Sequence, residues 1–132
     1  MRARETALCL LGLAAVTGAQ AAPTAAELAE IEHLMKAIGS SGCIFKRNEV
    51  WNNAAAAEAH LRSKFDLMKR FGLVETTADF IEKTATRGYF SNQPYEIKCS
   101  GETVLPSRVW LLAELVRYRA GRAAPAAAGD PH

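Results

Sequence analysis

Two cysteines, Cys43 and Cys99, constrain the fold of this 132-residue chain more than any other feature of its sequence. If the chain is exported, an oxidising compartment favours a disulfide between them. Closing a loop of nearly sixty residues stabilises a fold by about 4 kcal/mol in the chain-entropy model. That is a large part of the roughly 5–15 kcal/mol by which a small domain is stable. The pair is therefore predicted to form a structural disulfide, provided that the chain leaves the cytoplasm.

Residues 1–21 have the pattern of a cleavable signal peptide. Arginines precede the apolar run Leu8–Val16, LCLLGLAAV, whose length is typical of a signal-peptide core and too short to span a bilayer. Ala19-Gln20-Ala21 is a small-residue cleavage signal, so the mature chain is expected to begin at Ala22. An uncleaved membrane anchor would need a longer apolar stretch. We therefore predict a periplasmic protein with no stable membrane insertion after cleavage.

Other roles for the cysteines have less support in the sequence. A structural zinc site takes four ligands at short spacings, and catalytic thiols typically stand in a C-x-x-C motif; neither pattern is present. Cys9 lies within the apolar run and follows Leu8 rather than a small residue, so we interpret it as part of the discarded signal. We expect neither a metal nor a cofactor.

The charge of the mature chain excludes some classes of partner. Loss of the signal removes two arginines and one glutamate, which changes the formal net charge from +2 to +1. Nucleic-acid binding needs clustered basic charge, and attraction to an anionic membrane surface needs the same. We therefore expect no nucleic-acid partner, and the charge gives no reason to expect binding to a membrane surface.

The mature chain is long enough for one modest core. We expect a single domain over residues 22–119. The segment 120–132, AGRAAPAAAGDPH, is rich in Ala, Pro and Gly and has no apolar periodicity, which predicts a disordered tail.

Hydrophobic periodicity predicts four helices, one β-hairpin and one further strand. The helices are expected near residues 24–40, 53–71, 76–87 and 106–121, the hairpin near 43–51 with Asn48-Glu49 at its turn, and the strand over 95–99. Thr24 and Asn53 are the expected N-caps of the first two helices, and Thr76 opens a capping-box pattern.

The faces of these elements follow from the same periodicity. On the first helix Glu30 and His33 fall outside the apolar stripe, and on the second Leu67 and Phe71 widen it. The strand at 95–99 alternates, and it brings Cys99 to Cys43 if it lies beside the hairpin. The expected fold class is α+β, with about four α-helices packed on a small antiparallel sheet, the hairpin plus one strand, and one disulfide.

Several spaced motifs cover nearly the whole mature chain: Cys43-x-Phe45-x-Arg47-Asn48, Ala59-His60-Leu61-x-x-Lys64-Phe65, Ala78-Asp79-Phe80-Ile81, Pro94-Tyr95-x-Ile97-x-Cys99 and Trp110-Leu111-x-x-Glu114-Leu115-x-x-Tyr118-Arg119. Together they resemble the YfeK-like family of small exported bacterial proteins, a domain of unknown function. The resemblance implies one domain in the periplasm and supplies no catalytic residues. That family tends to have a Ser/Gly-rich turn before Pro-Tyr, whereas residues 86–93 here are bulkier and more aromatic.

Four aromatic residues flank the hairpin and the loop that precedes the last strand: Trp51, Tyr89, Phe90 and Tyr95. Buried, they would be ordinary core residues. Exposed, they would form an aromatic patch typical of a partner surface or a glycan groove. Together with Arg47 they are the candidate binding residues.

His60 and Glu114 are the candidates for acid/base chemistry. His60 lies within the widened apolar arc of its helix, either as a general base or as a partly buried histidine with a hydrogen-bond partner. Glu114 shares a helix face with Trp110 and Tyr118. A base such as Arg47 or Lys64 would pair with it structurally; burial without a partner would make it a candidate acid.

The sequence has no phosphate-binding glycine loop, no nucleophile elbow and no calcium loop. It therefore favours a module that binds an unidentified protein or polymer of the cell envelope. The alternative is a small hydrolase or lyase of an envelope polymer that uses His60 and Glu114. A third hypothesis is a structural subunit that oligomerises.

Overall fold

The computed structural model describes residues 12, 22–88 and 91–123, so the predicted signal peptide and most of the predicted tail lie outside the described residues. Helix α1 spans Ala25–Ser40. Its N-cap is Thr24, whose hydroxyl accepts the amide of Glu27 at 3.2 Å while the Glu27 carboxylate accepts the amide of Thr24 at 3.0 Å. This reciprocal pair satisfies two amides that the helix start leaves open. The predicted start of the first helix is confirmed.

A tight hairpin follows α1. Strand β1, Ile44–Arg47, pairs with strand β2, Val50–Asn53, in antiparallel register. The two turn residues, Asn48 and Glu49, both have positive φ, 50° and 65°. This is the backbone of a type I′ turn, whose twist matches that of the strands. The predicted hairpin and its turn are confirmed.

Helix α2, Ala54–Arg70, starts at its predicted N-cap, and Asn53 Oδ1 accepts the amide of Ala56 at 2.8 Å. The next helical segment is short. One turn, α3 (Thr77–Asp79), leads directly into the π-helical turn η1 (Phe80–Thr84). The segment therefore ends earlier than the predicted position near Arg87.

Two short strands and a long helix complete the fold. Strand β3 is Glu96–Lys98, strand β4 is Leu105–Pro106, and helix α4 is Ser107–Ala123. Sequence analysis did not predict β4. Helix α4 continues past its predicted end at Gly121, so the first residues of the segment predicted as a disordered tail are helical, and 124–132 lie outside the described residues.

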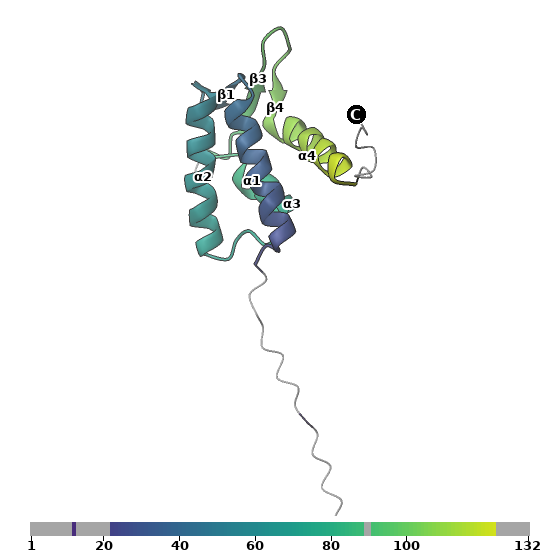
Figure 1. The fold of residues 1–132 in the computed structure, drawn as a ribbon. Coiled ribbons are helices and arrows are strands. Elements are labelled where there is room, and N and C mark those ends of the chain that lie inside the picture. Colours follow the sequence, from purple (N-terminus) through teal and green to yellow (C-terminus); the bar gives the residue numbers. More distant parts are fainter. Residues whose placement is uncertain (1–11, 13–21, 89–90, 124–132) are drawn as a thin grey trace, which may run out of the picture.

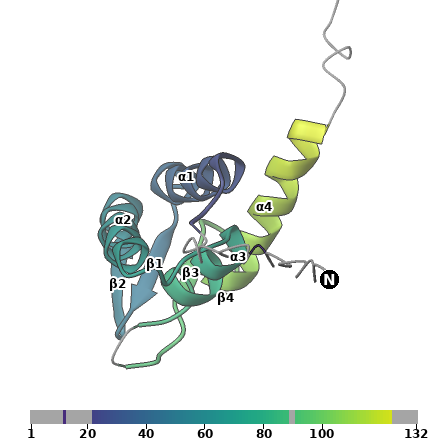
Figure 2. The same ribbon diagram turned by 90° about the horizontal axis from the view of Figure 1, so that it is seen from below.

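The strands form one antiparallel sheet in the order β2-β1-β3-β4. Cys43 and Cys99 form a disulfide immediately beyond the Ile44–Lys98 pair of β1 and β3. Helices α1 and α2 run side by side, and α4 leaves the body of the molecule at its C-terminal end (Figures 1 and 2). The predicted α+β class and the disulfide are confirmed, and the sheet has one strand more than predicted.

One face of the sheet contributes to the core. Phe45 and Ile97 point into it, whereas Ile44 and Lys98 on the opposite face are exposed. The helices supply the rest of the core, and its largest fully buried apolar side chains are Ile31, Leu34, Ile38, Val74, Phe80, Ile81 and Leu111.

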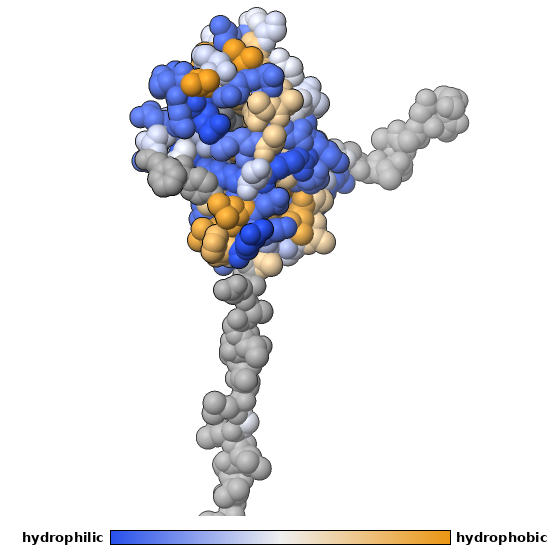
Figure 3. All heavy atoms as spheres, turned by 90° about the vertical axis from the view of Figure 1, so that its left-hand side faces the viewer, coloured by the Kyte–Doolittle hydropathy of each residue, from blue (hydrophilic) through white to orange (hydrophobic). Residues whose placement is uncertain are grey.

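The predicted positions of three side chains on α1 and α2 need correction. Glu30 is buried rather than exposed. Its carboxylate is satisfied there, because it accepts hydrogen bonds from Thr77 Oγ1 at 2.7 Å and from Arg119 at 2.6 and 3.0 Å. Leu67 and Phe71, by contrast, are 45 and 68% exposed and do not widen the buried stripe of α2. Hydrophobic colouring gathers near the lower end of this side of the molecule, where α2 ends (Figure 3). Among the described residues, no helix has the length and apolar character needed to cross a membrane.

Candidate functional site

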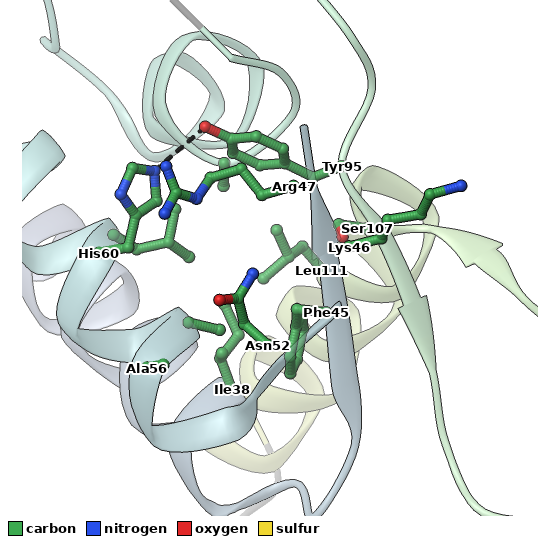
Figure 4. A pocket seen from close by; sticks show the side chains of 13 residues that line it. Ile38, Phe45, Lys46, Arg47, Asn52, Ala56, His60, Tyr95, Ser107 and Leu111 are labelled. Atoms are coloured by element: carbon green, nitrogen blue, oxygen red, sulfur yellow. Dashed lines mark hydrogen bonds between the residues drawn. The ribbon is translucent and has the colours of Figure 1, made fainter. Parts of the chain in front are cut away.

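A cavity of about 30 Å³ lies between the buried face of the sheet and helices α1, α2 and α4 (Figure 4). Most of its wall is apolar and includes Ile38, Phe45, Leu61 and Leu111. The polar residues along it are Lys46, Arg47, Asn52, His60, Tyr95 and Ser107, of which Lys46 points its side chain away from the cavity (Figure 4). Among the described residues, no aspartate or glutamate lines it.

The register of the hairpin separates two of the predicted binding residues. Arg47 is paired with Val50 and Lys46 with Trp51, and successive residues of a strand point to opposite faces. Arg47 therefore points to the helix-covered face, where it approaches His60 and Tyr95 (Figure 4). Trp51 lies on the outer face under the ammonium group of Lys46, 5.9 Å from its ring centre. The two residues do not share one binding surface.

Tyr95 is the centre of a polar cluster at the cavity. It is buried, and its hydroxyl lies 3.2 Å from Nε2 of His60 and 3.4 Å from Nζ of Lys64. Lys64, one turn after His60 on α2, is itself buried and donates a hydrogen bond to the carbonyl oxygen of Arg87 at 2.6 Å. Lys64 was predicted only as a possible partner of Glu114, although its spacing of four residues from His60 puts both on one face of the helix.

Burial and mutual repulsion lower the proton affinity of the two basic groups on α2. Desolvation lowers the pKa of His60, and the positive charges of Arg47 and Lys64 lower it further. Desolvation also lowers the pKa of Lys64 to about 8, with a smaller contribution from Arg47. Cations held close together in an apolar setting are stabilised by an anion that enters between them.

Arg47 and Ser107 have unused hydrogen-bonding groups at this cavity. Within the described ranges, the Arg47 guanidinium makes no hydrogen bond or ion pair. The Ser107 side chain is buried, and its hydroxyl has no hydrogen-bond partner there. Buried polar groups are normally paired, so an orphan hydroxyl in a cavity wall is a position where a ligand atom or a water is expected to bind.

The loop before β3 is tied to the turn of the hairpin. Ser91 Oγ lies 2.8 Å from Oδ1 of Asn48, and the amide of Gly88 donates to the carbonyl of Gln93 at 3.2 Å. A Cβ atom on Gly88 would lie 2.6 Å from Ser91 Oγ, so a larger residue there would displace this hydroxyl. Tyr89 and Phe90, the two aromatic candidates in this loop, lie outside the described residues.

Glu114 belongs to a different cluster, between α1 and α4. Its carboxylate accepts a hydrogen bond from His33 at 2.8 Å and also pairs with Arg117. The His33 ring stacks on Tyr118, with 4.2 Å between ring centres. His33, predicted outside the apolar stripe, is therefore in contact with α4, and the partners of Glu114 are neither Arg47 nor Lys64. His60 is thus hydrogen-bonded to Tyr95 and Glu114 to His33, so the two candidate residues belong to separate clusters. No set of three metal-ligating side chains gathers in the part of the chain that the structure describes.

The fold and the cavity define a class of protein: a small α+β domain with one disulfide and a cationic, largely apolar cavity between sheet and helices. Within that class the chain belongs to a family of unknown function, DUF5329, whose model matches residues 25–119. No curated protein and no solved structure matches it.

Proposed function

We propose that this chain is an exported, YfeK-like domain that binds a component of the cell envelope through the surface around Arg47. The observation that carries the proposal is the guanidinium of Arg47, which has no hydrogen-bond or ion-pair partner among the described residues. It lies beside an apolar cavity whose wall, in that same part of the chain, has no acidic residue. Most arginines of a folded protein that point toward its interior have a carboxylate partner. An arginine without one, at the edge of a cavity, is suited to bind a group from another molecule.

The contacts of the polar cluster favour binding over catalysis. Acid/base catalysis by His60 and Glu114 requires the two groups at one substrate, whereas His60 bonds to Tyr95 and Glu114 bonds to His33. The Tyr95 hydroxyl contacts both His60 and Lys64. These contacts fix the positions of the side chains around Arg47.

The disulfide supports the proposed location. It joins β1 to β3, the strands that carry Arg47 and lead from Tyr95. Disulfides persist in oxidising compartments and are rare in the cytoplasm, which agrees with the signal-peptide pattern at the N-terminus.

The test is capture of envelope components in the periplasm of a bacterial host after mild crosslinking. The full chain with its own leader is compared with Arg47→Gln, which faces the cavity, and with Trp51→Ala, which lies on the other face of the same hairpin. We expect Arg47→Gln to lose the captured components and Trp51→Ala to keep them. Unchanged capture by Arg47→Gln, or loss confined to Trp51→Ala, would contradict the proposed binding surface.

A further inference from the structure

We propose that the cavity binds a carboxylate attached to a short aliphatic group, with Arg47 pairing with the carboxylate and Ser107 donating a hydrogen bond inside the cavity. This inference rests on the proposed function, because it names the chemistry of the ligand for the same site. It requires only residues that line the cavity in the described part of the chain.

The charges around Arg47 indicate a negatively charged ligand. Four other arginines of the described chain have glutamate partners, namely Arg62, Arg108, Arg117 and Arg119. Arg70, Arg87 and Arg122 have no such partner among the described residues, but they do not line the cavity as Arg47 does. Lys46, which neighbours Arg47 on β1, has Glu49 at 3.2 Å and Glu96 at 3.7 Å. Those two carboxylates stand on the outer side with Lys46, so they do not neutralise Arg47 on the inner face. The matching anion is expected from outside the domain.

The composition of the wall favours a carboxylate over a phosphate. Transfer of an anion into an apolar cavity carries a large desolvation penalty, which grows with charge. A carboxylate has a single charge, and its two oxygens match the fork of a guanidinium. Arg47 is the cation that lines the cavity without a hydrogen-bond or ion-pair partner among the described residues. One unpaired positive charge fits one negative charge.

The size of the cavity limits the apolar part of the ligand. A volume of about 30 Å³ exceeds the minimum of about 10–15 Å³ that one water needs, so it holds only a few non-hydrogen atoms. The apolar side chains of Ile38, Leu61 and Leu111 face this space. A methyl or similarly short group beside the carboxylate therefore fits, whereas a long acyl chain does not.

The Ser107 hydroxyl is the second, independent observation. Ser107 is 4% exposed, lines the cavity and has no hydrogen-bond partner in the described ranges. Its own amide is already used, since it donates to the carbonyl of Tyr95 at 2.8 Å. A carboxylate oxygen or a neighbouring amide of the ligand would accept the hydrogen bond that the hydroxyl lacks.

Calorimetric titration of the purified, oxidised mature chain tests the inference. The probes are N-acetyl-L-alanine, N-acetyl-D-alanine, the uncharged N-acetylalanine amide and inorganic phosphate. The two enantiomers distinguish an ordinary protein C-terminus from a peptide that ends in a D-residue, since both carry the same chemistry. We expect at least one enantiomer to bind about tenfold or more tightly than the amide, because a charge-assisted hydrogen bond contributes roughly 1.5–3 kcal/mol.

Three variants locate the binding. Arg47→Gln is expected to weaken binding about tenfold or more, and Ser107→Ala by a smaller factor of roughly two to ten, as for one neutral hydrogen bond. Trp51→Ala is the matched control and is expected to bind as the parent does. Near-ultraviolet circular dichroism confirms that each variant is folded.

Equal binding of acid and amide, tighter binding of phosphate, or no binding of either enantiomer by the folded parent would overturn the carboxylate inference. If Arg47→Gln still loses envelope components in the crosslinking experiment, the proposed function stands without it. If a carboxylate binds in an Arg47-dependent way while crosslinking captures the same components from both proteins, the inference stands and the envelope-binding role fails.

Discussion

Nζ of Lys64 lies 3.4 Å from the hydroxyl of Tyr95 and 5.1 Å from the centre of its ring, in the interior of the domain. A lysine that is only 3% exposed is uncommon, and its oxygen contacts to Tyr95 and the Arg87 carbonyl are to neutral groups. The folded state therefore holds the proton of this lysine less tightly than the unfolded chain does.

This difference predicts that stability rises in alkaline solution. The pKa of Lys64 is about 8 in the folded state and 10.5 is its ordinary value. Between these values the unfolded chain binds more protons, so the free energy of unfolding increases with pH. Below pH 8 Lys64 is protonated in both states, so the cost of burying its charge is present in full. Between the two pKa values the free energy of unfolding increases by about 3 kcal/mol, at 1.36 kcal/mol per pKa unit.

Urea unfolding from pH 7 to pH 10.5 measures this increase. Lys64→Met is the matched variant, since methionine fills similar space without a charge. We expect the variant to lack the alkaline rise. A rise of equal size in both proteins would show that other groups cause it.

The buried carboxylate of Glu30 predicts a second effect on stability. Glu30→Ala removes the acceptor of Thr77 Oγ1 and of Arg119, and a buried hydroxyl left unpaired costs about 1–3 kcal/mol. Glu32→Ala, on the same helix, removes a more exposed pair with Arg62, worth about 1 kcal/mol or less. Thermal unfolding of both variants should show the larger loss for Glu30→Ala; equal losses would contradict the role of the buried network.

The hairpin turn predicts a stabilising substitution. Glu49 has φ of 65°, a conformation that costs non-glycine residues roughly 1 kcal/mol. Glu49→Gly creates the Asn-Gly pair that type I′ turns prefer, and it loses only an ion pair of the exposed Glu49 side chain with Lys46. We expect Glu49→Gly to be more stable than Glu49→Ala by about 1 kcal/mol in urea unfolding. Both variants lack the ion pair with Lys46, so equal stability of the two would contradict the backbone explanation.

Much of the fold could be predicted because local patterns determined it. The N-caps at Thr24, Asn53 and Thr76, the Asn48-Glu49 turn and the alternation of 95–99 each act over a few residues, and the structure has an element at each of them. Strand β4 has only two residues, one of them a proline. It therefore carries no periodicity, and its pairing with β3 depends on tertiary context.

The candidate site was predicted less completely because burial of polar groups depends on partners distant in sequence. Glu30 was predicted outside the apolar stripe, but Thr77 and Arg119 bind its carboxylate. Lys64 was considered only as a partner of Glu114, but it contacts Arg87 and Tyr95 instead. The placement of Arg47 and Trp51 on opposite faces could have been predicted from the sequence, because a two-residue turn at Asn48-Glu49 fixes which residues pair across the hairpin. The orphan hydroxyl of Ser107 had no signal in the sequence.

Alkylation mass spectrometry of the full chain, recovered from the periplasm of a bacterial host without reductant, tests the central claim most directly: export delivers the domain to a compartment where its two strands are covalently joined. The account predicts a chain that begins at Ala22, with Cys43 and Cys99 labelled only after reduction. Recovery of the chain with both thiols alkylated before reduction would contradict it.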